Sequence, residues 1–321
     1  MHVRQLSWIG AVIFTLALAT SSIGAAEFEK YLPDDTEVVF HANIRQALDS
    51  ALARKYLLPQ IQANLKGHAE VQEVLNALGL DPVKDLQSFT VAGPGNISEK
   101  KWTSFLRGSF DQDKIQAAAD AFASTQADVL KTHKQDGVTV YEIRDPKGAR
   151  SAFAAFIEKD LLLIASTKDQ VTASLAKKNA GKEPALNKAL SALIQEGNGK
   201  ESIWVAATPN QLINLLPQNN KLVMDFAKKI KSLKAGITLT DDFRFSLRIE
   251  TPDAKSAREV RQNLVGCQSL LILLVTSNDQ LKDFGSTLTD ILNSIKFTLD
   301  KSTVGMDLSV SNKQIEEGLN K

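Results

Sequence analysis

EVVFHANIRQALDSAL, residues 37–52, passes from an extended apolar run into a helix. The run from Glu37 to His41 is typical of a β-strand, because β-branched and aromatic side chains favour a pleated backbone. Asn43 is a preferred helix N-cap. After it, apolar residues recur at helical spacing, at Ile44, Ala47, Leu48, Ala51 and Leu52. This stretch therefore predicts a strand that leads directly into an amphipathic helix.

The same succession of strand, cap and helix recurs five more times. Each time, an extended run ends shortly before a Ser, Thr or Asp, and residues at helical spacing follow. The strands and their caps are residues 103–107 with Asp111, 161–165 with Ser166 or Thr167, 202–206 with Thr208, 244–249 with Thr251, and 304–310 with Ser311.

These six units fall into two sets of three in the same order. Asn43 matches Thr208 at a separation of 165 residues, Leu106-Arg107 matches Leu247-Arg248 at 141, and Thr167 matches Ser311 at 144. The caps Asn43, Asp111 and Thr167 then correspond to Thr208, Thr251 and Ser311. The first set contains an additional helical stretch, residues 59–80. We therefore expect a tandem duplication of one unit.

Short connections between strands set the fold class. Residues 138–143 meet residues 152–157 through a turn at 145–148, and a two-residue turn follows before residues 161–164. Such short turns require antiparallel neighbours. The sequence predicts an α+β fold of two similar lobes, each an antiparallel sheet with helices packed on one face. The expected parts are 27–198, with the helical insertion 59–80, and 199–321. A groove between the lobes is then expected as well.

The first 26 residues have the order of a secretory signal peptide. Arg4 precedes an uncharged apolar run from Leu6 to Ala19, and small residues follow up to Ala26. We expect cleavage after Ala25 or Ala26 and a periplasmic or otherwise exported protein. The alternative is an uncleaved anchor, since the segment is just long enough to span a bilayer. The segment contains no cysteine, so a lipid anchor is not expected, and no later segment is predicted to span a membrane.

Composition argues against some partners. Without residues 1–26 the chain has 37 basic and 37 acidic side chains, so its surface has no net field to attract nucleic acid. Hydrophobic residues make up 43% of the chain, enough for a packed core. Cys267 is the single cysteine and cannot form an internal disulfide. Its apolar neighbours favour a buried structural thiol.

The sequence contains no complete motif for catalysis, metal binding or cofactor binding. His41, His68 and His133 are far apart, and no cysteine pair or nucleophile elbow accompanies them. No glycine-rich phosphate loop is present. Asp111-Gln112-Asp113 begins like a calcium loop but lacks its later ligands, which favours helix capping. We therefore predict no catalytic, cofactor-binding or metal-binding residues, no bound cofactor, and no enzyme activity.

Two further features suggest binding only weakly. Lys228, Lys229, Lys231 and Lys234 could contact a polyanion such as a cell-wall polymer, although lysines near a helix C-terminus also suit the helix dipole. The turn Gly93-Pro94-Gly95-Asn96 could line the groove between the lobes, although the residues favour an ordinary hairpin turn.

Several stretches resemble a family of exported bacterial proteins of planctomycete type. They are residues 32–40 (LPDDTEVVF), 42–50 (ANIRQALDS), 79–82 (GLDP), 84–86 (KDL), 91–94 (VAGP) and 202–207 (SIWVAA). The resemblance covers most of the chain after residue 26 and is loose after about Phe226. It implies export and an envelope role. That family has no established activity or ligand, so the resemblance implies no site residues.

Together these observations predict an exported, non-catalytic binding or structural protein of the bacterial cell envelope. Its partner would be an unknown protein or envelope component. Two alternatives remain open. One is a carrier of an apolar or amphiphilic ligand, lined by residues 270–275 and 288–295, and the other is a hydrolase with an unrecognised site.

Overall fold

The structure is a computed structural model that describes residues 26–95, 101–135, 137–145, 151–180, 185–197, 199, 201–208, 221–278 and 282–319. Apart from Ala26, the predicted signal peptide lies outside these residues. Antiparallel strands and helices build the fold, so the predicted α+β class is confirmed. Among the described residues, no helix is long and apolar enough to cross a membrane.

The first half contains seven strands and most of the short helices of the described chain. Its helical elements are α2 (Ala26–Glu29), α3 (Ile44–Asp49), the π-helical turn η1 (Ala53–Leu57), α4 (Leu58–Gly67), α5 (Ala69–Leu78), α6 (Pro82–Asp85), α7 (Gln112–Thr125), α8 (Lys168–Ala180) and α9 (Lys188–Gly197). Its strands are β1 (Val38–Asn43), β2 (Leu86–Gly93), β3 (Thr103–Gly108), β4 (Leu130–Gln135), β5 (Val138–Arg144), β6 (Ser151–Glu158) and β7 (Leu161–Ala165).

The second half has five strands in its described residues. They are β8 (Ile203–Ala207), β9 (Ser232–Leu239), β10 (Phe243–Glu250), β11 (Lys296–Asp300) and β12 (Thr303–Val310). Its helices are α10 (Lys221–Ala227), α11 (Ala254–Ser277), α12 (Lys282–Asn293) and α13 (Asn312–Leu319). The 24-residue α11 is much longer than α7, the helix that follows β3 in the first half.

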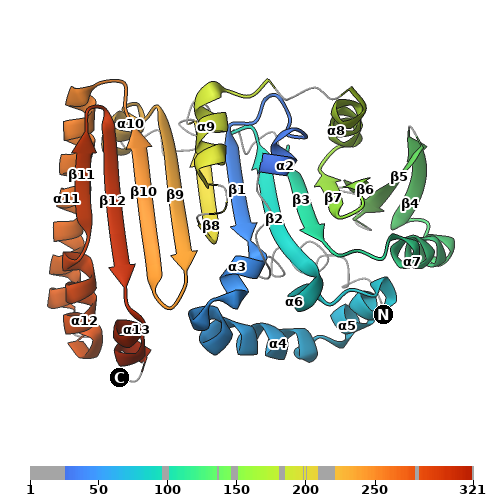
Figure 1. The fold of residues 1–321 in the computed structure, drawn as a ribbon, viewed down its shortest axis with the longest axis horizontal. Coiled ribbons are helices and arrows are strands. Elements are labelled where there is room, and N and C mark those ends of the chain that lie inside the picture. The colour runs from blue at the N-terminus through green and yellow to red at the C-terminus, as the bar shows by residue number, and fades with distance from the viewer. Residues whose placement is uncertain are drawn as a thin grey trace.

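All twelve strands form one sheet, in the order β11-β12-β10-β9-β8-β1-β2-β3-β7-β6-β5-β4 (Figure 1). The prediction of a separate sheet in each lobe is therefore wrong. The two halves join at β1 and β8, which pair antiparallel along five residues from Val38 opposite Ala207 to Ala42 opposite Ile203. A single edge-to-edge pairing hydrogen-bonds the backbone groups of both strands and leaves no exposed edge between the halves.

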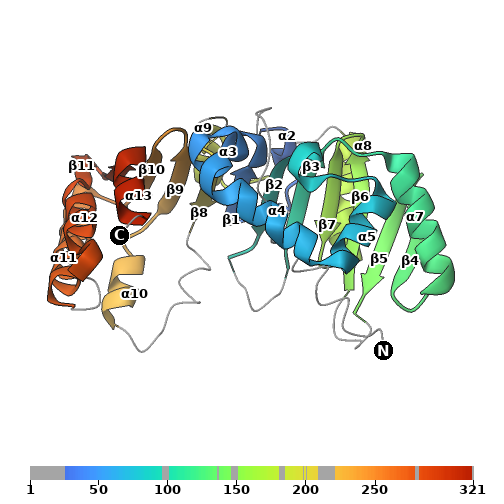
Figure 2. The same ribbon diagram turned by 90° about the horizontal axis from the view of Figure 1, so that it is seen from below.

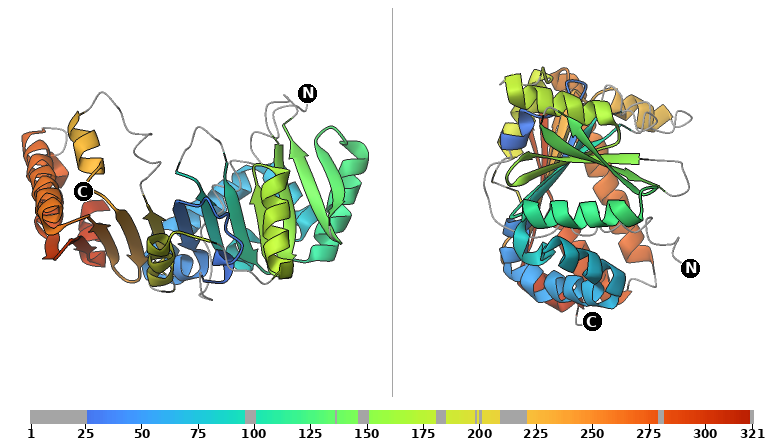
Figure 3. Two further views of the ribbon diagram at one scale, coloured as in Figure 1. Left: turned by 90° about the horizontal axis from the view of Figure 1, so that it is seen from above. Right: turned by 90° about the vertical axis from the view of Figure 1, so that its right-hand side faces the viewer.

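Helices cover both faces of the sheet in the first half, so the expectation of helices on one face is also wrong. The front face, nearer the viewer in Figure 1, carries Val39, Phe105 and Leu163 and is packed against α2, α8 and α9. The back face is packed against α3, α4 and α7. Figure 3 shows α8 and α7 on opposite sides of these strands, and Figure 2 shows α9 and α10 on opposite sides of the sheet. The strands here are apolar on both faces, which requires cover on both.

Most of the predicted caps are confirmed. Asn43 and Asp111 accept hydrogen bonds from the backbone N–H groups of Gln46 and Lys114. Thr167 and Ser311 cap α8 and α13 in the same way. The prediction that Thr251 caps a helix is wrong. Asp253 caps α11, while the buried Thr251 donates a hydrogen bond to Ser302 O. Thr208 lies directly before residues 209–220, which are outside the described residues.

The predicted insertion is helical but consists of two helices, α4 and α5, that meet at His68. Strands β4, β9 and β11 were not predicted. Strand β4, LKTHKQ, is an edge strand with two exposed lysines, Lys131 and Lys134, and edge strands commonly carry such charges. Cys267 is exposed on α11, so the prediction of a buried thiol is wrong.

Candidate functional site

The front face of the second half is polar and lacks a helical cover among the described residues. Helix α9 reaches β8 and β9, while α11 packs on the back face through Ala257 and Val260. The front face of β10, β12 and β11 is therefore open toward the viewer in Figure 1. The strand register places alternate residues of the three strands on this face. They are Arg244, Ser246 and Arg248 of β10, Gly305, Asp307 and Ser309 of β12, and Lys296 and Thr298 of β11.

A groove of about 520 Å³ lies on this open face. Its volume is within the range of small-molecule sites, although most such sites are more apolar. Most of its lining residues are polar or charged by type, and they come from or lie beside four strands and the segment before β8. The lining residues are Glu201, Thr238, Arg244, Phe245, Ser246, Ser294, Lys296, Asp307, Leu308 and Ser309.

Glu201 forms one wall of the groove because of two local features. Its side chain lies across Gly236, where an added Cβ would come within 2.6 Å of the Glu201 Cγ, so a larger residue could not occupy this position without displacing Glu201. It also pairs with Lys234, with Nζ 2.5 Å from Oε1, and both side chains are nearly buried. The other oxygen, Oε2, is buried and has no hydrogen-bond partner among the described residues. The pair fixes a carboxylate at the edge of the open face.

The floor of the groove has charges of both signs. Arg244, Lys296 and Asp307 are exposed and form no ion pair with another described residue. Hydroxyl groups of Thr238, Ser246, Ser294 and Ser309 lie among them. Such a surface can hold a polar ligand by charge-assisted hydrogen bonds. The described lining contains no histidine or cysteine, and although Asp307 lies opposite Ser246, no groove serine hydroxyl forms a hydrogen bond to a carboxylate or amine of a described residue.

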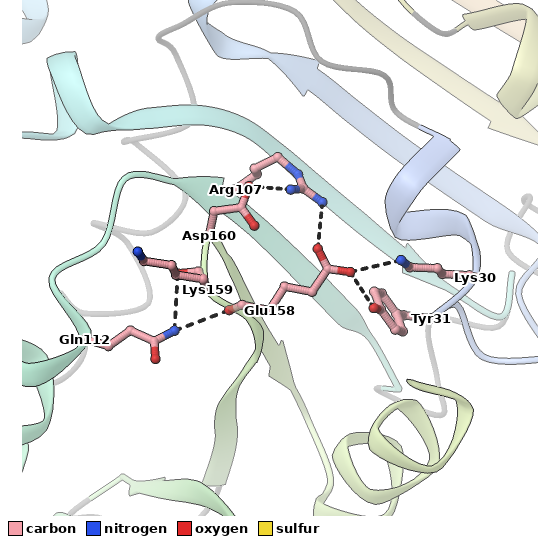
Figure 4. A network of polar contacts seen from close by, with 7 residues as sticks. All are labelled: Lys30, Tyr31, Arg107, Gln112, Glu158, Lys159 and Asp160. Carbon is pink, nitrogen blue, oxygen red and sulfur yellow. Dashed lines mark hydrogen bonds and ion pairs between the residues drawn. The ribbon is translucent and has the colours of Figure 1, made fainter. Parts of the chain in front are cut away.

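A second polar cluster lies on the front face of the first half (Figure 4). Arg107 of β3 is buried, with Nη1 2.5 Å from Asp160 Oδ2 and Nη2 3.7 Å from Glu158 Oε2. Glu158 Oε1 in turn accepts a 2.5 Å hydrogen bond from Tyr31 Oη and lies 2.9 Å from Lys30 Nζ. These contacts join the segment after α2 to β3 and to the turn between β6 and β7.

The pKa shifts in this cluster indicate a structural role. Burial acts to raise the pKa of Glu158, but hydrogen bonds from Tyr31 and Lys30 outweigh it, and the pKa lies below its ordinary value. Burial also raises the pKa of the Tyr31 hydroxyl, which therefore stays protonated and donates to Glu158. The lowered pKa keeps the Glu158 carboxylate ionised at neutral pH beside its cations, so it is not poised as a general acid.

His41 lies in the core, where β1 meets β8. Its ring stacks between Phe28 and Trp204, with ring centroids 5.5 and 5.3 Å away, and Nδ1 lies 2.8 Å from Thr90 Oγ1. Burial lowers its pKa to about 3, so the ring is neutral at physiological pH.

The structure does not bring the other sequence candidates together. His68 lies between α4 and α5, and His133 pairs with Glu142 at 2.8 Å on the edge strand β4. No cluster of three or more possible metal ligands occurs within the described ranges, and the predicted absence of a metal stays a prediction. Three of the four clustered lysines are paired with carboxylates: Lys229 with Glu259, Lys231 with Glu250, and Lys234 with Glu201. In the predicted turn, Gly93 ends β2, and Asn96 lies outside the described residues.

The groove itself was not predicted, although the sequence contains a signal for it. From Arg244 to Ile249 polar and apolar residues alternate strictly, and Val304 to Val310 nearly does the same. A period of two indicates a strand with one uncovered face. By contrast, LLLIA in β7 is apolar throughout and is covered on both faces.

Comparison with known proteins finds only a weak structural similarity. No protein-family model matches this sequence, and no curated protein does. Two crystal forms of TP0453, a Treponema protein, are similar in structure. Form I has a TM-score of 0.49 at 9% identity and covers 91% of this chain and 96% of TP0453. Form IV has a TM-score of 0.49 at 10% identity and covers 94% and 98%. At this level of similarity no function is transferred.

Proposed function

We propose that the protein is an exported, non-catalytic binding protein of the bacterial cell envelope. Export is supported by the signal-like sequence of residues 1–26 and by the resemblance to exported planctomycete-type proteins. The ligand would bind on the open front face of the second half. Two cations and one anion with surrounding hydroxyl groups suit a hydroxyl-rich molecule with an anionic group, such as a sugar phosphate or sugar acid of the envelope.

The polar, uncovered front face is the observation that supports this proposal most. The matching face of the first half is a packed core under α8, formed by Leu163, Ala155 and Ile157. In the second half the strands at this place have Asp307, Ser309 and Lys296 instead, and α13 contacts α12 rather than the front face. A sheet face that is polar and uncovered, with unpaired charges around a groove, is typical of a binding surface rather than of a folding core.

The test uses glucose 1-phosphate as the probe and follows backbone amide signals by NMR. We expect the amides of Ser246, Asp307 and Ser309 to shift on titration and to respond more weakly to glucose or inorganic phosphate alone. The double variant Arg244→Gln, Lys296→Gln should bind glucose 1-phosphate at least tenfold more weakly in the same titration. A matched variant, Lys168→Gln, Lys255→Gln, removes two exposed cations elsewhere and should keep the amide shifts. Shifts outside the groove, or equal loss in both variants, would contradict the proposal.

We also propose that the two halves arose by duplication. The strand order β1-β2-β3-β7-β6 of the first half is repeated as β8-β9-β10-β12-β11, which supports this. Phe40 and Val205, separated by the 165 residues that relate Asn43 to Thr208, face each other at the centre of the β1–β8 ladder. Two copies related by a two-fold axis at that point would produce this pairing. Strands β4 and β5 and helices α4 and α5 are additions to the first half.

An experimental structure that includes residues 209–220 tests the duplication. We expect Thr208 to cap a helix that starts at Pro209 and lies on the back face, as Asn43 caps α3. A helix on the front face, or an extended segment, would overturn the proposal. The alternative of an apolar carrier has no specific support, because Leu270, Leu273 and Leu274 lie on the outer surface of α11.

A further inference from the structure

The second half of α11 exposes a cluster of large apolar side chains. Leu270, Leu271, Leu273 and Leu274 are 61%, 48%, 60% and 62% exposed. Leu270, Leu273 and Leu274 are related by spacings of three and four positions and share one face of the helix, and Leu271 lies at the edge of that face. Scattered exposed leucines need no explanation, but a contiguous cluster on a stable monomer indicates an interaction surface. We call these four residues the leucine face.

The leucine face is free because α11 is supported from other directions. Its first half packs on the back of the sheet through Ala257 and Val260, and its second half lies beside α12, where Gln268 Nε2 donates a 2.6 Å hydrogen bond to Leu292 O. Figure 1 shows α11 at the outer end of the molecule. One turn before the leucines, Gly266 has nothing within 4 Å of an added Cβ, and Cys267 is exposed. The open surface thus continues along the helix.

We infer that the leucine face binds the leucine face of a second copy of this chain. No charged residue occurs from Gln262 to Asn278. Around a two-fold axis each residue meets its own copy or a close neighbour of it, so a charged face would repel itself, and an uncharged one does not. Two antiparallel α11 helices would place Leu270 and Leu274 of one copy against Leu274 and Leu270 of the other.

The size of the face indicates a weak dimer. Four half-exposed leucines provide a few hundred Å² of apolar surface, whereas stable interfaces bury roughly 800 Å² on each partner. The small Gly266 and Ser277 at either end allow the helices to approach closely. Dissociation constants from tens to hundreds of micromolar are therefore expected, so that the copies separate on dilution.

A lipid surface is the main alternative occupant, and the charges argue against it. Helices that lie on anionic membranes have Lys or Arg beside the apolar face. On α11 the basic residues are Lys255, Arg258 and Arg261, at least two turns before the leucines. A second copy needs no such charges.

Sedimentation velocity of the full chain across concentrations from about 1 to 500 µM tests the inference. We expect a reversible monomer–dimer equilibrium that the double variant Leu270→Gln, Leu274→Gln weakens at least tenfold. Gln retains helix propensity, so the helix should stay folded. The matched control Val74→Gln, Phe122→Gln removes two exposed apolar side chains from α5 and α7 and should leave the dimer intact. A monomer at all concentrations, or a dimer unaffected by the leucine substitutions, would overturn the inference.

Cross-linking through Cys267 tests the arrangement of the two copies independently. A bis-maleimide should cross-link two copies through this thiol in proportion to the dimer fraction. A chain with Cys267→Ser and Ser124→Cys has its thiol at an exposed position on α7 and should cross-link only at background level. Equal cross-linking of both chains contradicts the inference, and so does binding to neutral or anionic lipid vesicles that abolishes cross-linking and requires the same leucines.

Discussion

The front faces of the two halves differ more than their strand orders do. In the first half β3, β7 and β6 place Phe105, Leu163 and Ile157 under α2 and α8, and these side chains are fully buried. In the second half β10, β12 and β11 have the same order, but their front side chains are charged or small and polar. A strand order can thus persist while one face changes from core to open surface, because backbone pairing does not depend on which side chains cover the sheet.

The largest expected effect is on the free energy of unfolding, when one front-face side chain is removed from each half. Leu163→Ala should lower the free energy of unfolding by about 2–5 kcal/mol, because it removes a fully buried side chain and leaves a cavity. Asp307→Ala, on the strand that occupies the corresponding place in the second half, should change it by less than about 0.5 kcal/mol. Urea unfolding measures both. Similar losses in the two variants would mean that the front face of the second half is a core after all.

His41 predicts a pH effect at the junction between the halves. Its pKa of about 3 in the folded chain lies below the ordinary value of 6.5, so protonation favours the unfolded state. The contribution is complete above pH 6.5 and declines as the pH falls toward 3. By pH 5 the loss should reach about 2 kcal/mol. Most of this range lies above the ordinary pKa values of the carboxyl groups, which isolates the histidine.

The control for His41 replaces both hydrogen-bonding partners. His41→Phe with Thr90→Val keeps a ring between Phe28 and Trp204 and leaves no unpaired polar group. Its stability should be flat between pH 6.5 and 5 in urea titrations. A pH slope that persists in this variant would assign the effect to another group.

The aligned arginines provide a smaller contrast. Arg107→Met should cost about 1–3 kcal/mol, because it leaves Glu158 and Asp160, both partly exposed, without their buried cation. Arg248 is 60% exposed in its side chain and pairs with Glu196, so Arg248→Met should cost less than about 0.5 kcal/mol. Thermal and urea unfolding of the two variants should separate them. Equal costs would indicate that the Figure 4 cluster contributes nothing beyond a surface ion pair.

Local sequence patterns predicted the positions of helices and strands well, but they did not predict how the strands pair or which residues are exposed. Strand, cap and helix were predicted correctly at Asn43 and Asp111, because backbone N–H groups at a helix start impose the same demand everywhere. The joining of β1 to β8 was not predictable, since it depends on contacts between residues 165 positions apart. The exposure of Cys267 was missed because apolar neighbours normally indicate burial, whereas here they form the leucine face. The groove has no sequence motif, because its charges come from three separate strands and the segment before β8.

The smallest expected effect comes from removing either of two helix N-caps that have the same hydrogen bonds. Thr167 and Ser311 each accept a hydrogen bond from the N–H of the Gln three positions later, and that Gln accepts one from their own N–H. Removing such a cap costs about 1 kcal/mol when the helix unfolds with the rest of the protein. Helix α8 meets this condition, because Val171 and Leu175 are buried in the core. Thr167→Ala should therefore lower global stability by about 1 kcal/mol.

Helix α13 has no fully buried residue among its described side chains and contacts α12, Lys55 through Glu316, and Asp242 through the N–H of Asn312. Ser311→Ala should then let α13 open locally, since segments with few buried contacts unfold before the core. Urea unfolding should change by less than about 0.5 kcal/mol, while amide exchange in residues 314–317 accelerates several-fold. If both substitutions cost the same global stability, α13 belongs to the cooperative core. The open front face would then have a firmly held helix at its border, and the contrast between the halves would be confined to the strands.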